Sequence, residues 1–226
     1  SAVFFTIMAL CYVIANTRIA AGSAIVLQYT SSFWICGLSA WVLKERPQAG
    51  VLWFILLGFV GVAIIFAGEA IQSEAGKQAD PLGVLLALGA GLFYALLTLK
   101  LRELKAADSI FSILIICATS AAMLVPFVYW FGNLKVSSWT LLLLVITGVA
   151  QFGLPYYLYT LGLARVPAYQ AALITLIEPV LVPIWAYLAV RDPLPKYTAV
   201  GGGLILVALI LSLRAARRNA LAVESA

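Results

Sequence analysis

The chain has 226 residues and a formal net charge of +5, and 64% of its residues are hydrophobic while 10% are charged. Soluble globular chains contain roughly 45–50% apolar and about 25% charged residues. A water-soluble fold is therefore excluded, and the composition predicts an integral membrane protein.

Eight apolar segments follow one another along the chain. A helix needs about 20 apolar residues to cross the hydrocarbon core of a bilayer, and helices are expected because lipid offers no partner to open backbone groups. The predicted spans are Ala2–Ala15, Ala20–Leu43, Gly50–Gly68, Leu82–Leu101, Ile110–Phe131, Trp139–Leu163, Ala168–Val190 and Tyr197–Leu213. The sequence thus predicts an all-α, polytopic helix bundle.

The basic residues indicate how the chain is oriented. If successive loops alternate between the two sides, one side carries nine of the 14 Lys and Arg residues, and the last three of these lie in the tail 214–226. The positive-inside rule places this side in the cytoplasm. We therefore expect a multi-pass protein of the cell (inner or plasma) membrane with a cytoplasmic C-terminus.

The amino end is expected to be incomplete. Ser1 opens almost directly into an apolar run, and no basic region stands ahead of it as it would in a signal peptide. The first span is therefore predicted to be a shortened one.

The chain resembles itself when it is shifted by 147 residues. The shift pairs Phe5 with Phe152, Tyr12 with Tyr159, Arg18 with Arg165, Ala24 with Ala171, and Lys44-Glu45 with Arg191-Asp192. Lys44-Glu45 and Arg191-Asp192 lie on opposite predicted sides of the membrane, so the repeated units run in inverted orientation.

The repeat predicts how the chain is divided. Residues 1–68 would hold three spans of an incomplete first repeat, 69–81 the loop between repeats, 82–213 a complete five-span second repeat and 214–226 a basic tail. The predicted architecture is two inverted five-helix repeats, with eight spans present, and this design recurs in secondary transporters.

Several short motifs match a known family. The spans Ala20–Leu43 and Ala168–Val190 open with Ala-x-x-Ala, at Ala21/Ala24 and Ala168/Ala171. Lys44-Glu45-Arg46-Pro47 closes the earlier of these spans, Glu178-Pro179 lies within the later one, and Gly58-x-x-Gly61 lies in the span that follows Pro47. With these motifs the chain resembles the EamA-type branch of the drug/metabolite transporter superfamily. Asp192-Pro193 departs from the Glu-Arg that usually closes the family's second unit. The resemblance implies a ten-helix transporter, often an exporter of amino acids, metabolites or drugs.

Glu178 is the one acidic residue in the middle of a predicted span. An ionisable side chain at that depth costs several kcal/mol and usually marks a substrate or ion pathway. We therefore predict that Glu178 binds a substrate amine or a coupling proton, with a role in holding helices together as the alternative. Pro179 and Pro183, which remove backbone donors nearby, are predicted to be hinges together with Pro155.

Aromatic and amide side chains within the spans are expected to turn away from lipid, where their polar atoms would lack partners. Ordinary packing is the alternative for each of them. The predicted substrate-binding residues are Glu178, Tyr29, Gln28, Trp34, Tyr94, Gln151, Tyr156, Tyr157 and Trp185, with Tyr12 and Tyr159 as further candidates for the same pocket.

These features favour a secondary transporter for a small organic solute, with proton coupling and oligomeric state left open. We expect no enzyme activity, because the chain has no histidine and a single mid-span carboxylate. A membrane-embedded enzyme acting on lipids is the alternative of a different class. A nucleotide-sugar or phosphate-ester carrier would want basic residues in mid-span, and none lies there. No metal, cofactor or nucleic-acid partner is expected.

Overall fold

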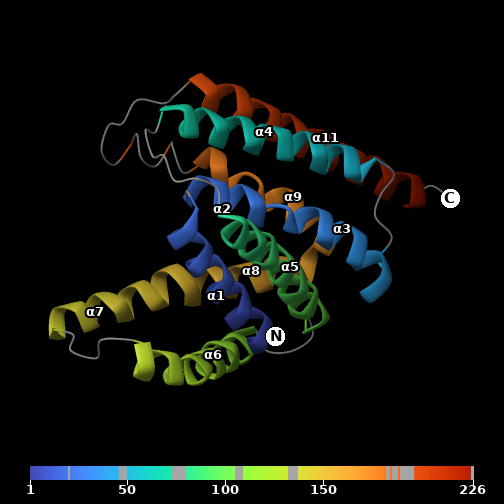
Figure 1. Ribbon diagram of the computed structural model, residues 1–226. Helices are drawn as coiled ribbons and strands as arrows, with labels where there is room; N and C mark the ends of the chain where they lie inside the picture. Colours follow the sequence, from blue (N-terminus) through green and yellow to red (C-terminus); the bar gives the residue numbers. More distant parts are fainter. Residues whose placement is uncertain are drawn as a thin grey trace.

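The computed structural model describes all residues except 20, 46–49, 73–79, 105–108, 132–136, 182–183, 185–187, 189–195 and 225–226. Within these ranges the regular structure is helical throughout (Figure 1). The helices are α1 (Ala2–Arg18), α2 (Ala21–Gln28), α3 (Ser31–Val42), α4 (Val51–Gln72), α5 (Pro81–Glu103), α6 (Ser109–Phe131), α7 (Ser138–Thr147), the π-helix η2 (Gly148–Gly153), α8 (Leu154–Arg165), α9 (Ala168–Thr175) and α11 (Lys196–Glu224).

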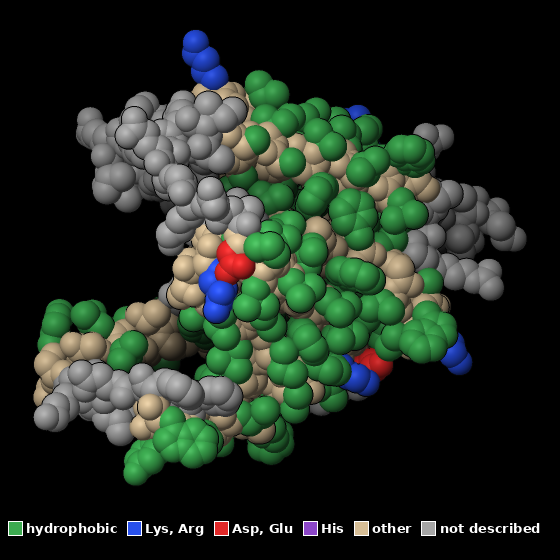
Figure 2. Space-filling model, viewed as in Figure 1, with side chains coloured by type: hydrophobic (Ala, Val, Ile, Leu, Met, Phe, Trp, Pro, Cys, Tyr) green, Lys and Arg blue, Asp and Glu red, His purple; other side chains and the backbone are tan. Residues whose placement is uncertain are grey.

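The predicted apolar segments are mostly helical where they are described. Five helical stretches are long and apolar enough to cross a membrane, and three shorter apolar helices lie at Ala2–Arg18, Ala168–Leu181 and Ala199–Ala215. Hydrophobic side chains cover most of the face shown in Figure 2, and charged side chains are few on it. This surface suits lipid contact, and the protein is a multi-pass membrane protein.

The carboxyl end differs from a simple tail. Helix α11 continues to Glu224, well beyond the end of the last predicted span at Leu213. The segment after Leu213 is rich in Ala and Arg, which are among the strongest helix formers. Helix propensity therefore extends the helix although the apolar pattern stops.

Helices α4 and α11 lie side by side at one edge of the molecule (Figure 1). Gly61 and Gly201 allow this approach, because a Cβ added to either residue would overlap the backbone of the other. Small residues often bring transmembrane helices this close. Gly203, by contrast, has open space where its side chain would be.

Two spans are interrupted, at positions 147 residues apart. The first interruption, Tyr29-Thr30, separates α2 from α3, and the second, Leu176-Ile177, separates α9 from a short helical turn at 178–181. Three hydrogen bonds from a backbone amide to a carbonyl recur at both breaks. In the first, Thr30 donates to Leu27, and Phe33 and Trp34 donate to Thr30. In the second, Ile177 donates to Ile174, and Val180 and Leu181 donate to Ile177. The two breaks therefore share one local backbone arrangement.

Different side chains accompany the two breaks. Pro179 has no amide hydrogen and cannot donate to the Thr175 carbonyl, so it interrupts the second span. Ser32 stands at the equivalent place in the first span, and its amide donates to the Tyr29 carbonyl at 3.1 Å. Gly91 of α5 packs against this first break, where an added Cβ would lie 2.9 Å from the Gln28 carbonyl oxygen.

The two broken spans cross each other in the middle of the bundle. The Ser32 hydroxyl near the start of α3 donates to the Ala172 carbonyl at 3.4 Å. At the other end, Glu45, just beyond α3, accepts the amide hydrogen of Ala168, the first residue of α9. Helix α9 therefore begins where α3 ends and runs antiparallel to it.

Candidate functional site

A cavity of about 520 Å³ opens at the crossing of the two broken spans. Helices α1, α5 and α8 and the π-helix η2 complete its wall. The described residues that line it are Met8, Ala9, Tyr12, Val13, Ile25, Gln28, Tyr29, Ser31, Tyr94, Phe152, Pro155, Tyr156, Tyr159, Thr175 and Glu178. Its volume falls in the range of small-molecule sites.

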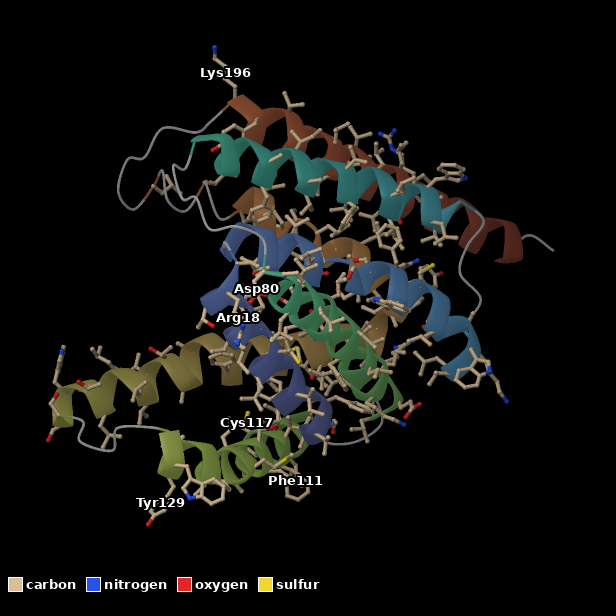
Figure 3. The ribbon with its side chains drawn as sticks, in the orientation of Figure 1. Arg18, Asp80, Phe111, Cys117, Tyr129 and Lys196 are labelled. Atoms are coloured by element: carbon tan, nitrogen blue, oxygen red, sulfur yellow. The ribbon has the colours of Figure 1, made fainter. Side chains whose placement is uncertain are left out.

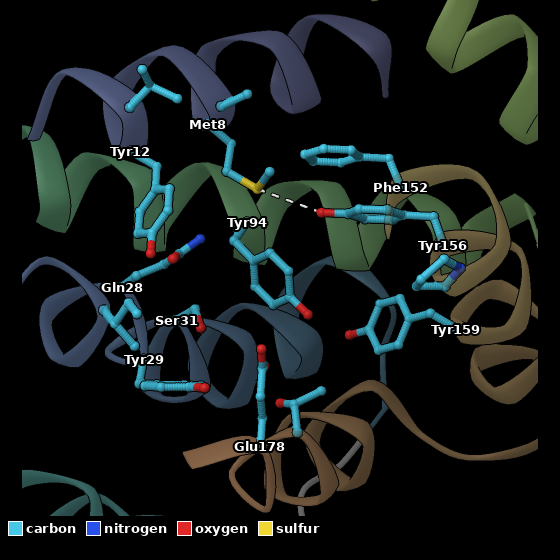
Figure 4. A pocket seen from close by; sticks show the side chains of 15 residues that line it. Met8, Tyr12, Gln28, Tyr29, Ser31, Tyr94, Phe152, Tyr156, Tyr159 and Glu178 are labelled. Carbon is cyan, nitrogen blue, oxygen red and sulfur yellow. Dashed lines mark hydrogen bonds between the residues drawn. The ribbon is translucent and has the colours of Figure 1, made fainter. Parts of the chain in front are cut away.

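Glu178 supplies the single formal charge among the described side chains of the cavity wall. It is the first residue of the helical turn after the second break, and its carboxyl points into the cavity between the Tyr29 and Tyr159 rings (Figure 4). The side chain is exposed to the cavity rather than packed between helices. A ligand can therefore reach the carboxylate.

Tyrosine rings form the wall next to the carboxyl. The Tyr94 and Tyr159 rings lie 6.3 Å apart between centroids, and the Tyr159 hydroxyl is 3.2 Å from the Thr98 hydroxyl. The Tyr156 hydroxyl donates to the sulfur of Met8 at 4.0 Å, which Figure 4 marks as a dashed line. These contacts orient the rings: the Tyr94 and Tyr159 hydroxyls lie toward Glu178, and the Tyr156 hydroxyl lies toward Met8 (Figure 4).

The π-helix shapes the opposite wall. The Leu154 amide donates to the Val149 carbonyl, five residues back, and Pro155 follows without an amide hydrogen. Single π-turns in otherwise α-helical spans are frequent at functional sites. Here the turn places Phe152 and Pro155 in the cavity wall.

The 147-residue shift pairs ten of the fifteen wall residues with one another. The pairs are Met8 with Pro155, Ala9 with Tyr156, Tyr12 with Tyr159, Gln28 with Thr175, and Ser31 with Glu178. Phe5 also packs edge-on against its own counterpart Phe152, with centroids 6.4 Å apart. The positions in the wall are thus nearly symmetric, whereas the side chains differ, most of all at Ser31 and Glu178.

A half-buried ion pair holds the start of α9. The Arg102 Nε lies 2.7 Å from the Glu45 Oε1, with 11% and 19% of the two side chains exposed. Arg102 also donates to the Leu163 carbonyl at the end of α8, while the second Glu45 oxygen accepts the Ala168 amide hydrogen at 3.0 Å. Four segments of the chain are tied together at this point.

Backbone geometry brings Glu45 into that position. Lys44 adopts a φ of 55°, a left-handed conformation that is uncommon for a residue with a Cβ. The chain reverses there, and the Glu45 amide donates to the Ser39 carbonyl at 3.3 Å. The carboxylate then faces α9 instead of continuing along α3.

A second ion pair is more exposed. Arg18 at the end of α1 lies 2.8 Å from Asp80, with 44% and 33% of the side chains exposed (Figure 3). Asp80 also caps α5 by accepting the Leu82 amide hydrogen at 3.1 Å. The hydrogen bond from Arg18 and the one from the Leu82 amide lower the pKa of the Asp80 carboxyl.

Most of the predicted binding residues line the cavity: Glu178, Tyr29, Gln28, Tyr94 and Tyr156, with Tyr12, Tyr159 and Pro155. Two others do not. Trp34 is 47% exposed and lies one turn beyond Ser31 along α3. Tyr157 is rotated by about 100° from Tyr156 on the same helix, so it points away from the face that Tyr156 and Tyr159 share.

Of the remaining predicted residues, the structure describes Pro179 fully, Gln151 in part, and Pro183 and Trp185 not at all. Pro179 is buried at the second break, beside Glu178. Gln151 lies in η2, but its side chain is outside the described residues, and so are Pro183 and Trp185 altogether.

Seven wall residues were not predicted: Met8, Ala9, Val13, Ile25, Ser31, Phe152 and Thr175. The 147-residue shift gives a signal for four of them: it pairs Met8, Ala9, Ser31 and Thr175 with the predicted residues Pro155, Tyr156, Glu178 and Gln28. Small hydroxyl residues within an apolar span carry no pattern of their own, because they also occur as ordinary packing residues.

The described side chains include no group of three or more His, Cys, Asp or Glu residues placed to hold a metal ion. Cys11, Cys36 and Cys117 are free thiols. The chemistry that the cavity offers is therefore binding by one carboxylate, hydroxyls, an amide and aromatic faces.

Relatives of the chain carry transporter names. A protein of Archaeoglobus fulgidus described as an uncharacterized transporter is 24% identical over 212 residues, which cover 93% of this chain and 73% of that protein. The uncharacterized transporter YwfM of Bacillus subtilis is 28% identical over 225 residues, which cover 96% of this chain and 70% of YwfM.

A solved crystal structure, described only as that of a protein, has the same fold. It superposes with a TM-score of 0.80 at 19% sequence identity, over 95% of this chain and 74% of the other. At this identity the likeness concerns the fold alone, and it agrees with the predicted helical bundle.

The family model for EamA-like transporters matches residues 81–214, which are more than half of the chain. With transporter-named relatives over most of its length and a solute-sized cavity between its helices, the protein is a transporter and not an enzyme. The chain belongs to the EamA-like transporter family.

Proposed function

We propose that the protein is a secondary transporter that exports a small organic solute, such as an amino acid, metabolite or drug, by alternating access. The observation that carries this proposal is the accessible Glu178 carboxyl in a tyrosine-lined cavity at the crossing of two broken spans. Discontinuous helices that meet at a midplane site are the recurring design of such carriers. No basic side chain is among the described residues of the wall, which disfavours a phosphate-ester substrate.

The alternating movement would come from two inverted repeats. We assign residues 1–68 to the first repeat, 69–81 to the connection, 82–213 to the second repeat and 214–226 to the tail. The paired wall residues, the two breaks 147 residues apart and the antiparallel course of α3 and α9 support this division. The breaks, Pro155 and Pro179 are the proposed hinges, and Pro183 is assigned with them from the sequence.

The proposed orientation follows from the charged residues. Arg102, Glu45 and the amino end of α9 meet at one end of the bundle, and this end carries the larger share of the basic residues. We assign it to the cytoplasm of the cell (inner or plasma) membrane, together with the C-terminus. A cysteine introduced at Arg214 should then react with an impermeant thiol reagent in inverted vesicles but not in intact cells.

The test is efflux from proteoliposomes. Vesicles loaded with a mixture of amino acids, nucleosides and amines should release at least one solute faster than protein-free vesicles. Glu178→Gln should abolish that difference while the protein keeps its elution volume and helical content. Equal efflux from wild-type and empty vesicles for every solute would refute the proposal, and so would undiminished efflux by the Gln variant.

Coupling is tested in the same vesicles. The Glu178 carboxyl is the proposed site for a coupling proton, because a membrane-embedded carboxyl can alternate between a proton and a ligand. An imposed pH gradient should then drive solute movement, and the gradient should have no effect in Glu178→Gln.

A further inference from the structure

We propose that the solute is an organic monocation: a protonated amine that carries a flat apolar body. The inference rests on the proposed function and narrows its substrate class. Its basis is the division of the cavity into a carboxylate end, formed at the second break, and an aromatic and thioether end, formed by α1, η2 and α8.

The charge of the wall selects the sign of the ligand. Among its described residues Glu178 is acidic and none is basic. A carboxylate in an apolar span is costly without a cation or proton beside it. The Arg and Lys side chains whose ion pairs are described, Arg18, Lys100 and Arg102, bind other carboxylates, namely Asp80, Glu103 and Glu45. The ligand itself is thus the natural counter-ion.

Tyrosines surround the place where that cation would lie. Tyr29, Tyr94 and Tyr159 line the cavity on the same side as the Glu178 carboxyl (Figure 4). Ring faces attract an ammonium group through their quadrupole, and the attraction is largest where water is displaced. Hydroxyl oxygens around the same point can accept hydrogen bonds from its N–H groups. A carboxylate within a group of tyrosines therefore suits an ammonium better than a neutral group.

The other end of the cavity suits the ligand's body. Met8, Phe152 and Tyr156 lie together on the side away from Glu178 (Figure 4). Phe5 packs edge-on against Tyr156 at 5.2 Å, which fixes that ring from behind. Thioether and aromatic surfaces favour a flat apolar group.

A zwitterion or an anion lacks an equivalent partner. The carboxylate of an amino acid would enter a wall whose described residues carry no positive charge, and it would repel Glu178. Gln28 and Ser31 can donate hydrogen bonds to that carboxylate, but neither supplies a positive charge to offset its repulsion by Glu178. We therefore expect amines to be preferred over the amino acids that share their ring.

The test uses four ligands with one phenyl ring and different charges: phenethylamine, phenylalanine, 3-phenylpropionate and 2-phenylethanol. Binding to the purified protein is measured by calorimetry, and efflux of each is measured from proteoliposomes. Phenethylamine should bind most tightly, and Glu178→Gln should weaken it at least about 30-fold. Glu178→Asp, which keeps the charge, should retain part of the affinity. The matched control is Glu103→Gln, which removes a carboxylate far from the cavity wall and should change nothing.

The outcomes separate this inference from the proposed function. Preferred binding or efflux of phenylalanine, 3-phenylpropionate or 2-phenylethanol would overturn the cation assignment and leave a transporter in place. Efflux of other solutes without any phenethylamine binding would do the same. Phenethylamine binding that survives intact in a folded Glu178→Gln protein would refute the role of the carboxylate. Absence of efflux for every solute, in contrast, bears on the proposed function.

Discussion

The two broken spans share a backbone and differ in chemistry. Both interruptions show the same three hydrogen bonds and both contribute side chains to the cavity. At equivalent positions, however, the first offers Ser31 and Gln28 while the second offers Glu178 and Thr175. The shared backbone therefore gives both spans the same local shape, whereas one side chain of the second span, Glu178, supplies the charge.

The two broken spans also differ in the ion pairs that hold their starts. The second span starts at Ala168, which is held by the half-buried pair of Glu45 and Arg102. The first follows Arg18, whose pair with Asp80 is far more exposed. Electrostatic attraction is screened less where water is excluded, so the second span is fixed more firmly.

The largest effect is expected from moving the carboxylate between the halves. Glu178→Ser should weaken phenethylamine binding at least about 30-fold. Adding Ser31→Glu should recover part of the loss, because the two positions are equivalent in the cavity wall. Calorimetry on the single and double variants measures the recovery.

The matched control for this exchange is Ser31→Gln in the Glu178→Ser background, which adds similar bulk without charge. It should remain as weak as the single variant. Equal affinities for the Glu and Gln double variants, both well folded, would show that the two halves are not interchangeable.

Arg102→Gln should give the next largest effect, on stability. The change leaves the half-buried Glu45 carboxylate without its cation and the Leu163 carbonyl without its donor. Removing one partner of such a pair costs about 2–4 kcal/mol, which thermal unfolding in detergent should report as a clear drop in midpoint. Lys100→Gln, which breaks an exposed pair with Glu103 two residues earlier on the same helix, should cost less than about 1 kcal/mol. Similar midpoints for the two variants would contradict the stronger anchoring of the second span.

Gly91→Ala tests the first break itself. A methyl group there would lie 2.9 Å from the Gln28 carbonyl oxygen and 3.0 Å from the Thr30 hydroxyl. Overpacking of this kind costs about 1–3 kcal/mol, and the displaced Gln28 should also alter ligand affinity. In Gly89→Ala, the control on the same helix, the nearest atom would be the Cys11 sulfur at 3.9 Å. That variant should be neutral or slightly more stable, since Ala favours helix more than Gly does. Equal unfolding midpoints for both would rule out close packing at the break.

Asp80→Asn should have the smallest effect. The pKa of the Asp80 carboxyl is lowered in the folded protein by Arg18 and the Leu82 amide, so its ionised form adds stability above the ordinary Asp value. That contribution is present at neutral pH and disappears as the pH falls through the lowered pKa. The unfolding midpoints of wild type and variant should therefore differ slightly at pH 7 and converge in acid. A difference that grows with acidity would contradict this sign.

The spans could be predicted from the sequence because hydropathy alone determines them. The break positions could be predicted only in part. Pro179 predicts the second break. Ser32 stands at the equivalent position of the first break, and a serine does not predict an interruption. What accompanies the first break is the approach of Gly91 from another helix, and a contact between segments 60 residues apart is not readable from a local pattern.

The candidate site shows the same limit. Glu178 and the tyrosines were identified because charge and aromatic hydroxyls are unusual within a span. Trp34 is predicted for the same reason, although it is exposed and does not line the cavity. Ser31 nearby does line the cavity, but no local sequence pattern marks it. Tyr156 and Tyr157 could be told apart only by the rotation of α8, which the π-turn before it resets. The 147-residue shift points to Ser31, because it pairs Ser31 with Glu178.

The contact of Gly61 with Gly201 restricts which parts of the molecule can move. Where two backbones touch without side chains between them, sliding one helix along the other would drive a neighbouring Cβ into a carbonyl oxygen. Helices α4 and α11 therefore resist sliding past each other, and we expect this pair to move together although its two helices belong to different proposed repeats. Any rocking that exposes the cavity to alternate sides has to bend elsewhere along the chain.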